Sequence, residues 1–264
     1  MNLGLQGKLA LVTGSTAGIG FAIAGTLAAE GARVVVNGRT QARVDAALGR
    51  LRGSHPQAAV CGVATDLGTA AGATRLFQQV PSAEIVVNNL GIFEVKPFLE
   101  ISDADWQRFF EVNVMSGVRL SRHYLPGMLK QNWGRIIFIS SESAQQIPVE
   151  MIHYGMTKTA QVSIARGIAQ SVAGTGVTVN SVLVGPTASE GVGKFLKEMA
   201  AQQGKQASEM EAEFFKTARP TSLLRRFETP EEVAAVVAFV AAAQGAVMNG
   251  AAVRAEGGLL QGVL

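Results

Sequence analysis

Seven short runs of apolar and β-branched residues recur along the chain, and segments long enough for helices separate them. Two of these runs, residues 85–87 and 136–139, are apolar at every position and show no alternation with polar residues. Strands buried on both faces have this pattern, because helices cover both sides of the parallel sheet that contains them. The sequence therefore predicts a doubly wound α/β fold with a parallel sheet of about seven strands.

The 264 residues (1–264) are expected to form a single domain, because no linker or internal repeat divides them. Strands are expected at residues 8–13, 33–37, 58–64, 84–88, 135–140, 177–182 and 251–254, and long helices at 20–30, 103–130, 154–173 and 230–243. The segment 187–228 breaks this rhythm, since it mixes a helical apolar pattern with polar turns. An insertion of this length predicts a lid over a bound substrate.

A glycine-rich turn at residues 13–20 directly follows the first expected strand and opens the first expected helix. Gly14 permits a tight turn, Gly18 lets the backbone approach a pyrophosphate, and Gly20 lets the helix pack closely on the strand. The N–H groups and the positive dipole end of the helix would hold the phosphates. The residues expected to contact the phosphates are Gly14, Ser15, Thr16, Gly18, Ile19 and Gly20.

Six further motifs follow this turn along the chain. They are 88–91 (Asn-Asn-Leu-Gly), Asn113, Ser140 with Ser141, Tyr154 with Lys158, 185–187 (Gly-Pro-Thr) and 255–258 (Ala-Glu-Gly-Gly). In their order and spacing the chain resembles the short-chain dehydrogenases/reductases over nearly its full length, with Leu90 where that family usually has alanine. The resemblance implies a Rossmann fold and an enzyme that transfers a hydride between a nicotinamide and a small-molecule carbonyl or alcohol.

The candidate catalytic group centres on Tyr154 and Lys158, which are four residues apart on an expected helix and so share one face. A tyrosine with its ordinary pKa near ~10 is a poor base, and a nearby ammonium would lower that pKa. Tyr154 could then exchange a proton with the substrate oxygen. By the family's spacing Ser141 would hydrogen-bond that oxygen, with Ser140 as the competing choice, and Asn113 would help to hold a water-linked proton path to Lys158.

Two neighbours of this group are assigned by geometry and context. His153 precedes Tyr154, but adjacent residues on a helix point about 100° apart, so His153 is expected to be structural or part of a pocket wall. Glu142 could face substrate or be a solvated loop carboxylate, and the second interpretation is favoured. The expected pocket walls are apolar, which fits a medium-sized ketone, a 3-oxoacyl group or a ring alcohol better than a free polyol. These walls are Ile147, Pro148, Met151, Val192, Phe195 and Leu196.

The end of the second expected strand indicates which nicotinamide cofactor is used. NAD enzymes place an acidic side chain here for the adenosine ribose, whereas this chain has Gly38 followed by Arg39. A guanidinium suits a 2′-phosphate, so NADP(H) is favoured over NAD(H). The remaining cofactor contacts, which include the aspartate that meets adenine in the family, are expected at Asp66, Leu67, Asn89, Gly91, Tyr154, Lys158, Pro186 and Thr187.

Composition excludes several other classes of protein. The pI of 9.2 comes with a net charge of only +3 and scattered basic residues, so no nucleic-acid partner is expected. The longest apolar run, 233–243, is too short to span a membrane. The single cysteine, Cys61, rules out an intrachain disulfide, fits a reducing cytoplasm and is expected to be buried.

Two rival functions and the assembly complete the expectations. A 3-oxoacyl-carrier-protein reductase is the rival among enzymes, and a non-catalytic NADP(H)-sensing regulator is the rival of another class. The combination of Ser141, Tyr154 and Lys158 argues against a sensor, which needs no proton donor. No metal site is expected, and the resemblance implies a homo-oligomer, a dimer or a homotetramer, formed through the long helices.

Overall fold

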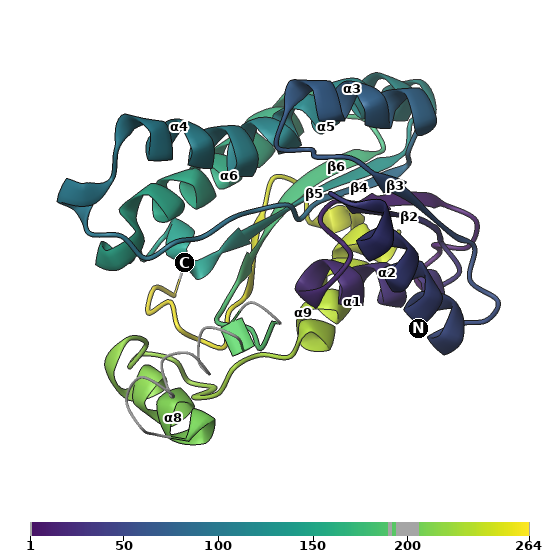
Figure 1. Ribbon diagram of the computed structural model, residues 1–264. Helices are drawn as coiled ribbons and strands as arrows, with labels where there is room; N and C mark the ends of the chain where they lie inside the picture. The colour runs from purple at the N-terminus through teal and green to yellow at the C-terminus, as the bar shows by residue number, and fades with distance from the viewer. Residues whose placement is uncertain (1, 190–191, 194–205, 264) are drawn as a thin grey trace.

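Seven parallel strands form one sheet in the computed structural model, which describes residues 2–189, 192–193 and 206–263 (Figure 1). The strands are β1 Leu9–Val12, β2 Arg33–Gly38, β3 Val60–Ala64, β4 Ile85–Asn88, β5 Gly134–Ser141, β6 Val177–Val184 and β7 Ala252–Ala255. Their order across the sheet is β3-β2-β1-β4-β5-β6-β7. The chain thus starts near the middle, winds to one edge and returns to wind to the other, which confirms the doubly wound fold. Ligands bind such sheets at the carboxyl ends of the strands, where the winding reverses.

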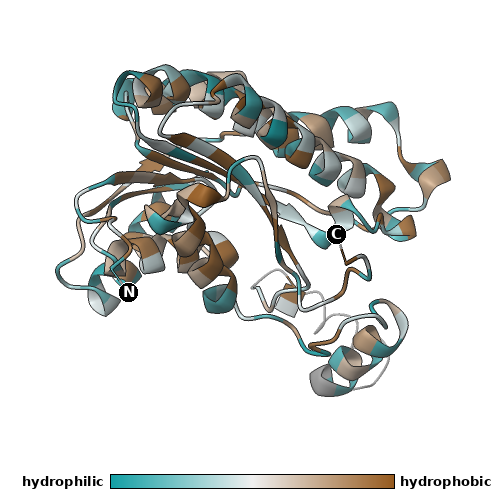
Figure 2. Cartoon of the chain, turned by 180° about the vertical axis from the view of Figure 1, so that it is seen from behind, coloured by the Kyte–Doolittle hydropathy of each residue, from teal (hydrophilic) through white to brown (hydrophobic). Residues whose placement is uncertain are grey.

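Helices cover both faces of the sheet (Figure 1). One face carries α1 Gly18–Ala29, α2 Gln41–Ser54 and α9 Pro230–Ala241, and the other carries α3 Ala70–Gln79, α5 Ser116–Lys130 and α6 Ile152–Ser171. Successive residues of one strand enter different cores, since Leu11 packs in the second layer and Val12 in the first. The uninterrupted apolar runs follow from this double burial, and brown strands between the two helix layers show it in Figure 2.

The long helix expected at 103–130 is divided into three parts. It consists of α4 Asp103–Phe110, a π-helical turn at Glu111–Met115 and α5. Such wide turns are rare and are frequently found at functional sites. Asn113 lies at the middle of this turn.

Cys61 is exposed, so the expectation of a buried thiol was wrong. β3 is an edge strand, and α2 packs on only one of its faces, where a side chain added at Gly62 would meet Val44 and Leu48. Cys61 points to the opposite face. The apolar run around Cys61 was therefore a poor guide to burial, since an edge strand need not be covered on both sides.

The apolar run at 233–243 falls in α9 and the residues just after it, and the helix is buried at Val233, Val237 and Val240, as expected. Among the described helices, none has the length and apolar character needed to cross a membrane. Within the same ranges, no three side chains of His, Cys, Asp or Glu cluster as a metal site would require. Helix α8 Ala207–Thr217 lies within the expected lid and stands apart from the sheet (Figure 1), and short 3-10 helices lie at Phe98–Glu100, Glu142–Ala144, Val149–Met151 and Gln244–Val247.

Candidate active site

The glycine-rich turn connects β1 to α1 and has the backbone geometry that its sequence requires. Gly14 and Gly18 have φ angles of +59° and +55°, a region that other residues rarely adopt. A side chain at Gly20 would overlap Asn89 and would lie 2.6 Å from the Gly14 carbonyl oxygen, so only glycine allows this approach. In the described part of the chain no side chain caps the N-terminus of α1. The end of this helix therefore suits an anionic phosphate.

Two residues expected at the cofactor serve the turn itself. Ser15 is buried, and its hydroxyl donates to the Val12 carbonyl (2.6 Å) and accepts from the Asn37 N–H (2.9 Å). Asn89 donates through Nδ2 to the carbonyls of Thr13 (2.9 Å) and Gly14 (3.2 Å). These bonds fix the shape of the loop, so the turn would meet a phosphate mainly through its backbone.

The adenosine end of the expected site lies beside β2 and β3. A side chain at Gly38 would overlap Thr16, which leaves no room for an acidic residue in the present packing. Arg39, the next residue, is exposed. Asp66 is exposed and accepts a hydrogen bond from the Gly68 N–H (3.0 Å), while Leu67 is buried in the core. Size exclusion at Gly38 is a signal that the sequence alone did not contain.

Ser141, Tyr154 and Lys158 converge at the carboxyl end of β5 and the first turns of α6. Ser141 hydrogen-bonds the Tyr154 side chain, and the Lys158 Nζ lies 5.5 Å from the centre of the Tyr154 ring. The Ser140 hydroxyl instead donates to the backbone carbonyl of Lys158 (2.9 Å). Of the two serines, Ser141 is therefore the one that contacts Tyr154, and Ser140 bonds the backbone of α6.

The electrostatics of Tyr154 differ from the expectation based on Lys158. Burial and the negative charge of Glu142 raise the pKa of Tyr154 above its ordinary value, while the Ser141 hydrogen bond and the Arg219 charge act in the lowering direction. Burial lowers the pKa of Lys158 to about 8, although the Glu142 carboxylate opposes that shift. Tyr154 therefore keeps its proton at neutral pH, which is the form that can donate to a carbonyl oxygen.

A glutamine that sequence analysis missed connects the lysine to Asn113. The Lys158 Nζ donates to the Ile139 carbonyl (2.9 Å) and to Oε1 of the buried Gln161 (3.3 Å). The Gln161 Nε2 donates to the backbone carbonyl of Asn113 (2.6 Å). An ammonium can only donate and a carbonyl can only accept, so this orientation of the amide is fixed. The Gln161 side chain therefore joins Lys158 to the backbone carbonyl of Asn113.

The Asn113 side chain holds the strand-four loop against α6. Its Oδ1 accepts from the Ile92 N–H (2.8 Å), and its Nδ2 donates to the Ile92 carbonyl (2.9 Å) and to the Thr157 hydroxyl (3.0 Å). Gly91 precedes this loop contact, and a side chain there would lie 3.5 Å from both Asn113 and Lys158. The π-helical turn thus supplies both a side chain and a carbonyl to the site.

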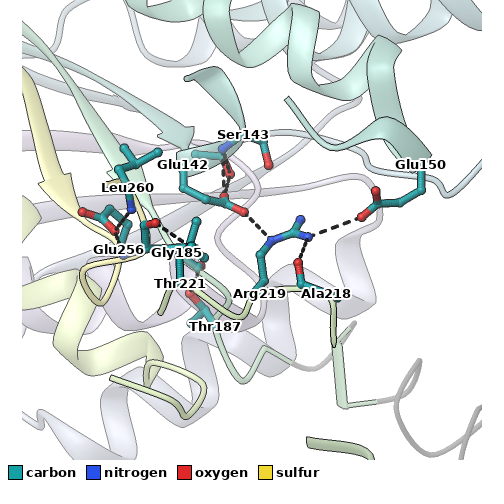
Figure 3. Close-up of polar contacts among 12 residues, drawn as sticks. Glu142, Ser143, Glu150, Gly185, Thr187, Ala218, Arg219, Thr221, Glu256 and Leu260 are labelled. Carbon is teal, nitrogen blue, oxygen red and sulfur yellow. Dashed lines mark hydrogen bonds and ion pairs between the residues drawn. The ribbon is translucent and has the colours of Figure 1, made fainter. Parts of the chain in front are cut away.

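Glu142 is a buried, paired carboxylate (Figure 3). The favoured expectation of a solvated loop carboxylate was therefore wrong. Its Oε2 hydrogen-bonds the Ser141 hydroxyl and accepts from the Ser143 N–H (2.9 Å). Its Oε1 accepts from Nε of Arg219 (3.1 Å), which follows α8 and also donates to Glu150 (3.4 Å). This contact spans 77 residues of sequence, so no local pattern could reveal it.

His153 packs as a structural residue, which is one of the two roles expected for it. It is fully buried, and its ring centre lies 3.9 Å from that of Phe109 and 6.0 Å from that of Trp106. Burial lowers its pKa, so the neutral imidazole is favoured. His153 packs between α4 and α6 and has no place in the proton chemistry.

The segment after β6 is tied back to the residues before α9. The Glu228 N–H donates to the Pro186 carbonyl (2.9 Å), and the Thr187 hydroxyl donates to the Gly185 carbonyl (3.0 Å). Of the expected pocket walls, Ile147 is partly exposed, whereas Phe195 and Leu196 lie outside the described residues. The same holds for 190–191 and 194–205 of the expected lid.

Comparisons with known proteins identify the family of this chain. A family model described as short chain dehydrogenase matches residues 8–200, and the chain belongs to the short-chain dehydrogenase/reductase family. It is 49% identical to YvaG, an uncharacterised oxidoreductase of Bacillus subtilis, over 100% of both chains. It is 31% identical to the 3-oxoacyl-acyl-carrier-protein reductase FabG of Aquifex aeolicus, over 98% of this chain and 100% of that protein.

A crystal structure of L-sorbose reductase from Gluconobacter frateurii with NADPH and L-sorbose superimposes with a TM-score of 0.94 at 30% identity, covering 100% of both chains. The chain is thus an oxidoreductase that acts on CH–OH and C=O groups.

Proposed function

We propose that this protein is an NADP(H)-dependent oxidoreductase that interconverts a carbonyl and a secondary alcohol, with Tyr154 as the acid/base. The observation that carries the proposal is the convergence of Ser141, Tyr154 and Lys158 at the carboxyl end of β5. Ser141 would hold the substrate oxygen, and Tyr154 would give it a proton during reduction or remove one during oxidation. The Lys158 ammonium would stabilise the phenolate that reduction leaves behind.

The residues present fit a nicotinamide dinucleotide. The close approach at Gly20 and the uncapped start of α1 suit a pyrophosphate held by backbone N–H groups. The cofactor, when bound, supplies or accepts the hydride. We assign its contacts to the backbone of the glycine-rich turn and to Asp66, Gly91, Pro186 and Thr187.

Preference for NADP(H) is supported by the end of β2. The overlap with Thr16 disfavours an acidic side chain at position 38, and the exposed Arg39 offers a cation for the 2′-phosphate. The ratio of kcat/KM for NADPH to that for NADH measures this preference. A ratio below one would contradict it.

A panel of carbonyl compounds, followed by loss of NADPH absorbance, tests the reaction. Ketones, ketoses and 3-oxoacyl thioesters belong in this panel, the last because FabG is a relative. Turnover of any of them, lost in Tyr154→Phe, supports the proposed enzyme over an NADP(H)-sensing regulator.

We also propose that the protein is a cytoplasmic homotetramer. Light scattering on the purified protein would test the oligomeric state.

A further inference from the structure

A buried pair of opposite charges forms one side of the candidate active site. Glu142 and Arg219 have side chains only 6% and 11% exposed, and they come from opposite sides of the site, after β5 and after α8 (Figure 3). Burying two charges has a desolvation cost that their attraction often does no more than offset, so an apolar pair of similar size would serve stability as well. The pair therefore calls for an explanation in terms of function.

The position of this pair relates it to the substrate. The Glu142 carboxylate hydrogen-bonds Ser141, and both Glu142 and Arg219 shift the pKa of Tyr154, in opposite directions. A carbonyl oxygen bound by Ser141 and Tyr154 would bring the substituents of its carbon towards Glu142 and its partner Arg219, because Glu142 bonds the same serine hydroxyl. The pair is thus placed to discriminate among substrates by the groups attached to the carbonyl carbon.

The chemistry of the pair limits the substituents that it can accept. The two charges cancel, so a carboxylate on the substrate would meet the like charge of Glu142, and an ammonium would meet that of Arg219. An alkyl group would cover the pair and return no hydrogen bond. A hydroxyl group can donate to the carboxylate and accept from the guanidinium at once, and such charge-assisted bonds are strong.

We propose that Glu142 and Arg219 form a hydroxyl-binding pair, and that the substrate is an uncharged ketone with a hydroxyl group next to its carbonyl, such as a hydroxyketone or a ketose. This inference rests on the proposed carbonyl–alcohol reaction and names its substrate class. It differs from the expectation of an apolar wall, which was derived from Ile147, Phe195 and their neighbours before the pairing of Glu142 with Arg219 was known.

Matched ketones provide the test. The initial rates of NADPH oxidation are compared for butanone and 3-hydroxybutanone, for cyclohexanone and 2-hydroxycyclohexanone, and for acetoacetate as a charged ketone. The wild-type enzyme is expected to favour the hydroxylated member of each pair by at least about tenfold in kcat/KM, because a site built to bond a hydroxyl rejects an analogue that lacks it. Acetoacetate is expected to be the poorest substrate.

Variants then assign the discrimination to the pair. The double variant Glu142→Gln/Arg219→Gln removes both charges together, so that no unpaired charge is left buried, and Arg219→Lys keeps the charge but loses the planar fork. Both are expected to bring the preference for hydroxyketones, measured as the ratio of kcat/KM within each ketone pair, to near one. Glu30→Gln, the same exchange at an exposed site, is the control and should keep the preference.

Melting temperature and NADPH fluorescence establish that each variant folds and binds the cofactor. Equal kcat/KM for both members of each ketone pair in the wild type would overturn the inference, as would an unchanged preference in folded Arg219→Lys. A wild-type enzyme that reduces no carbonyl compound at all would instead overturn the proposed function, so the two failures are distinguishable.

Discussion

The two halves of the candidate site are built by different means. On the cofactor side, the turn after β1 offers backbone groups, and its polar side chains, such as those of Ser15 and Asn89, are spent on holding the turn in shape. On the substrate side, two charged side chains from distant segments, Glu142 and Arg219, pair with each other, and Glu142 also contacts Ser141. If the proposed roles hold, the comparison teaches that a common ligand is bound by backbone that few substitutions can alter, whereas selectivity depends on side chains that single substitutions can change.

The largest expected effect lies where the two halves meet. Tyr154→Phe removes the proton donor and keeps the ring, so kcat should fall by roughly two to four decades, the usual scale of general acid–base catalysis. NADPH binding, measured by fluorescence titration, should stay close to that of the wild type because the turn is untouched. Wild-type rates in this variant would remove Tyr154 from the mechanism.

Substitution of Gln161 should have the next largest effect on kcat. Gln161 positions Lys158 and belongs to neither the cofactor side nor the substrate side of the site. Gln161→Leu breaks the bonds to Lys158 and to the Asn113 carbonyl, and kcat should fall by about ten- to hundredfold, as expected for hydrogen bonds to a charged group. Gln161→Glu keeps an acceptor for the ammonium and should raise the pKa of Lys158 above about 8.

The readout for Gln161 is the pH dependence of kcat, because a purely structural role would lower kcat without moving the profile. The Gln161→Glu profile should shift towards higher pH relative to the wild type. Profiles that coincide in wild type, Gln161→Leu and Gln161→Glu would contradict a positioning role.

On the cofactor side, the preference for NADPH over NADH should be difficult to reverse unless the packing around Gly38 is changed as well. Gly38→Asp alone should impair both cofactors, because its side chain would overlap Thr16. Adding Thr16→Ser and Arg39→Ser makes room and removes the cation, and the kcat/KM ratio of NADPH to NADH should then fall by about tenfold or more. Gly38→Asp with wild-type NADPH kinetics would show that Thr16 moves aside easily.

The smallest expected effect concerns His153 and the pH dependence of the free energy of unfolding. His153 belongs to neither side of the site. The pKa of His153 is lowered in the folded state, so the unfolded chain binds the proton more readily. The contribution to stability is therefore complete above the unfolded pKa of about 6.5 and is lost as pH falls through the lower pKa of the folded state. Urea unfolding at pH 7.5 and 5.5 measures this difference, and His153→Phe should reduce it. An equal pH response in both proteins would assign the acid sensitivity elsewhere.

The sequence was informative wherever the chemistry is local. The turn at 13–20 and the pair of Tyr154 with Lys158 depend on spacing within one loop or one helix, so both could be recognised before the fold was known. The burial of Glu142 could not, because its partner is 77 residues away. Gln161 lies one helical turn beyond Lys158, but its link to Asn113 requires α6 to pack against the π-helical turn. Tertiary contacts thus decide the part of the site to which we assign substrate selection.

The exposed position of Cys61 has a practical consequence. This thiol is the only cysteine in the sequence, and it lies on the outermost strand of the cofactor half. A maleimide dye would therefore attach at one place per molecule, without any mutagenesis. Such a dye would sit on the strand that leads to Asp66, where its emission could report the arrival of the nucleotide while leaving the chemistry at Tyr154 undisturbed.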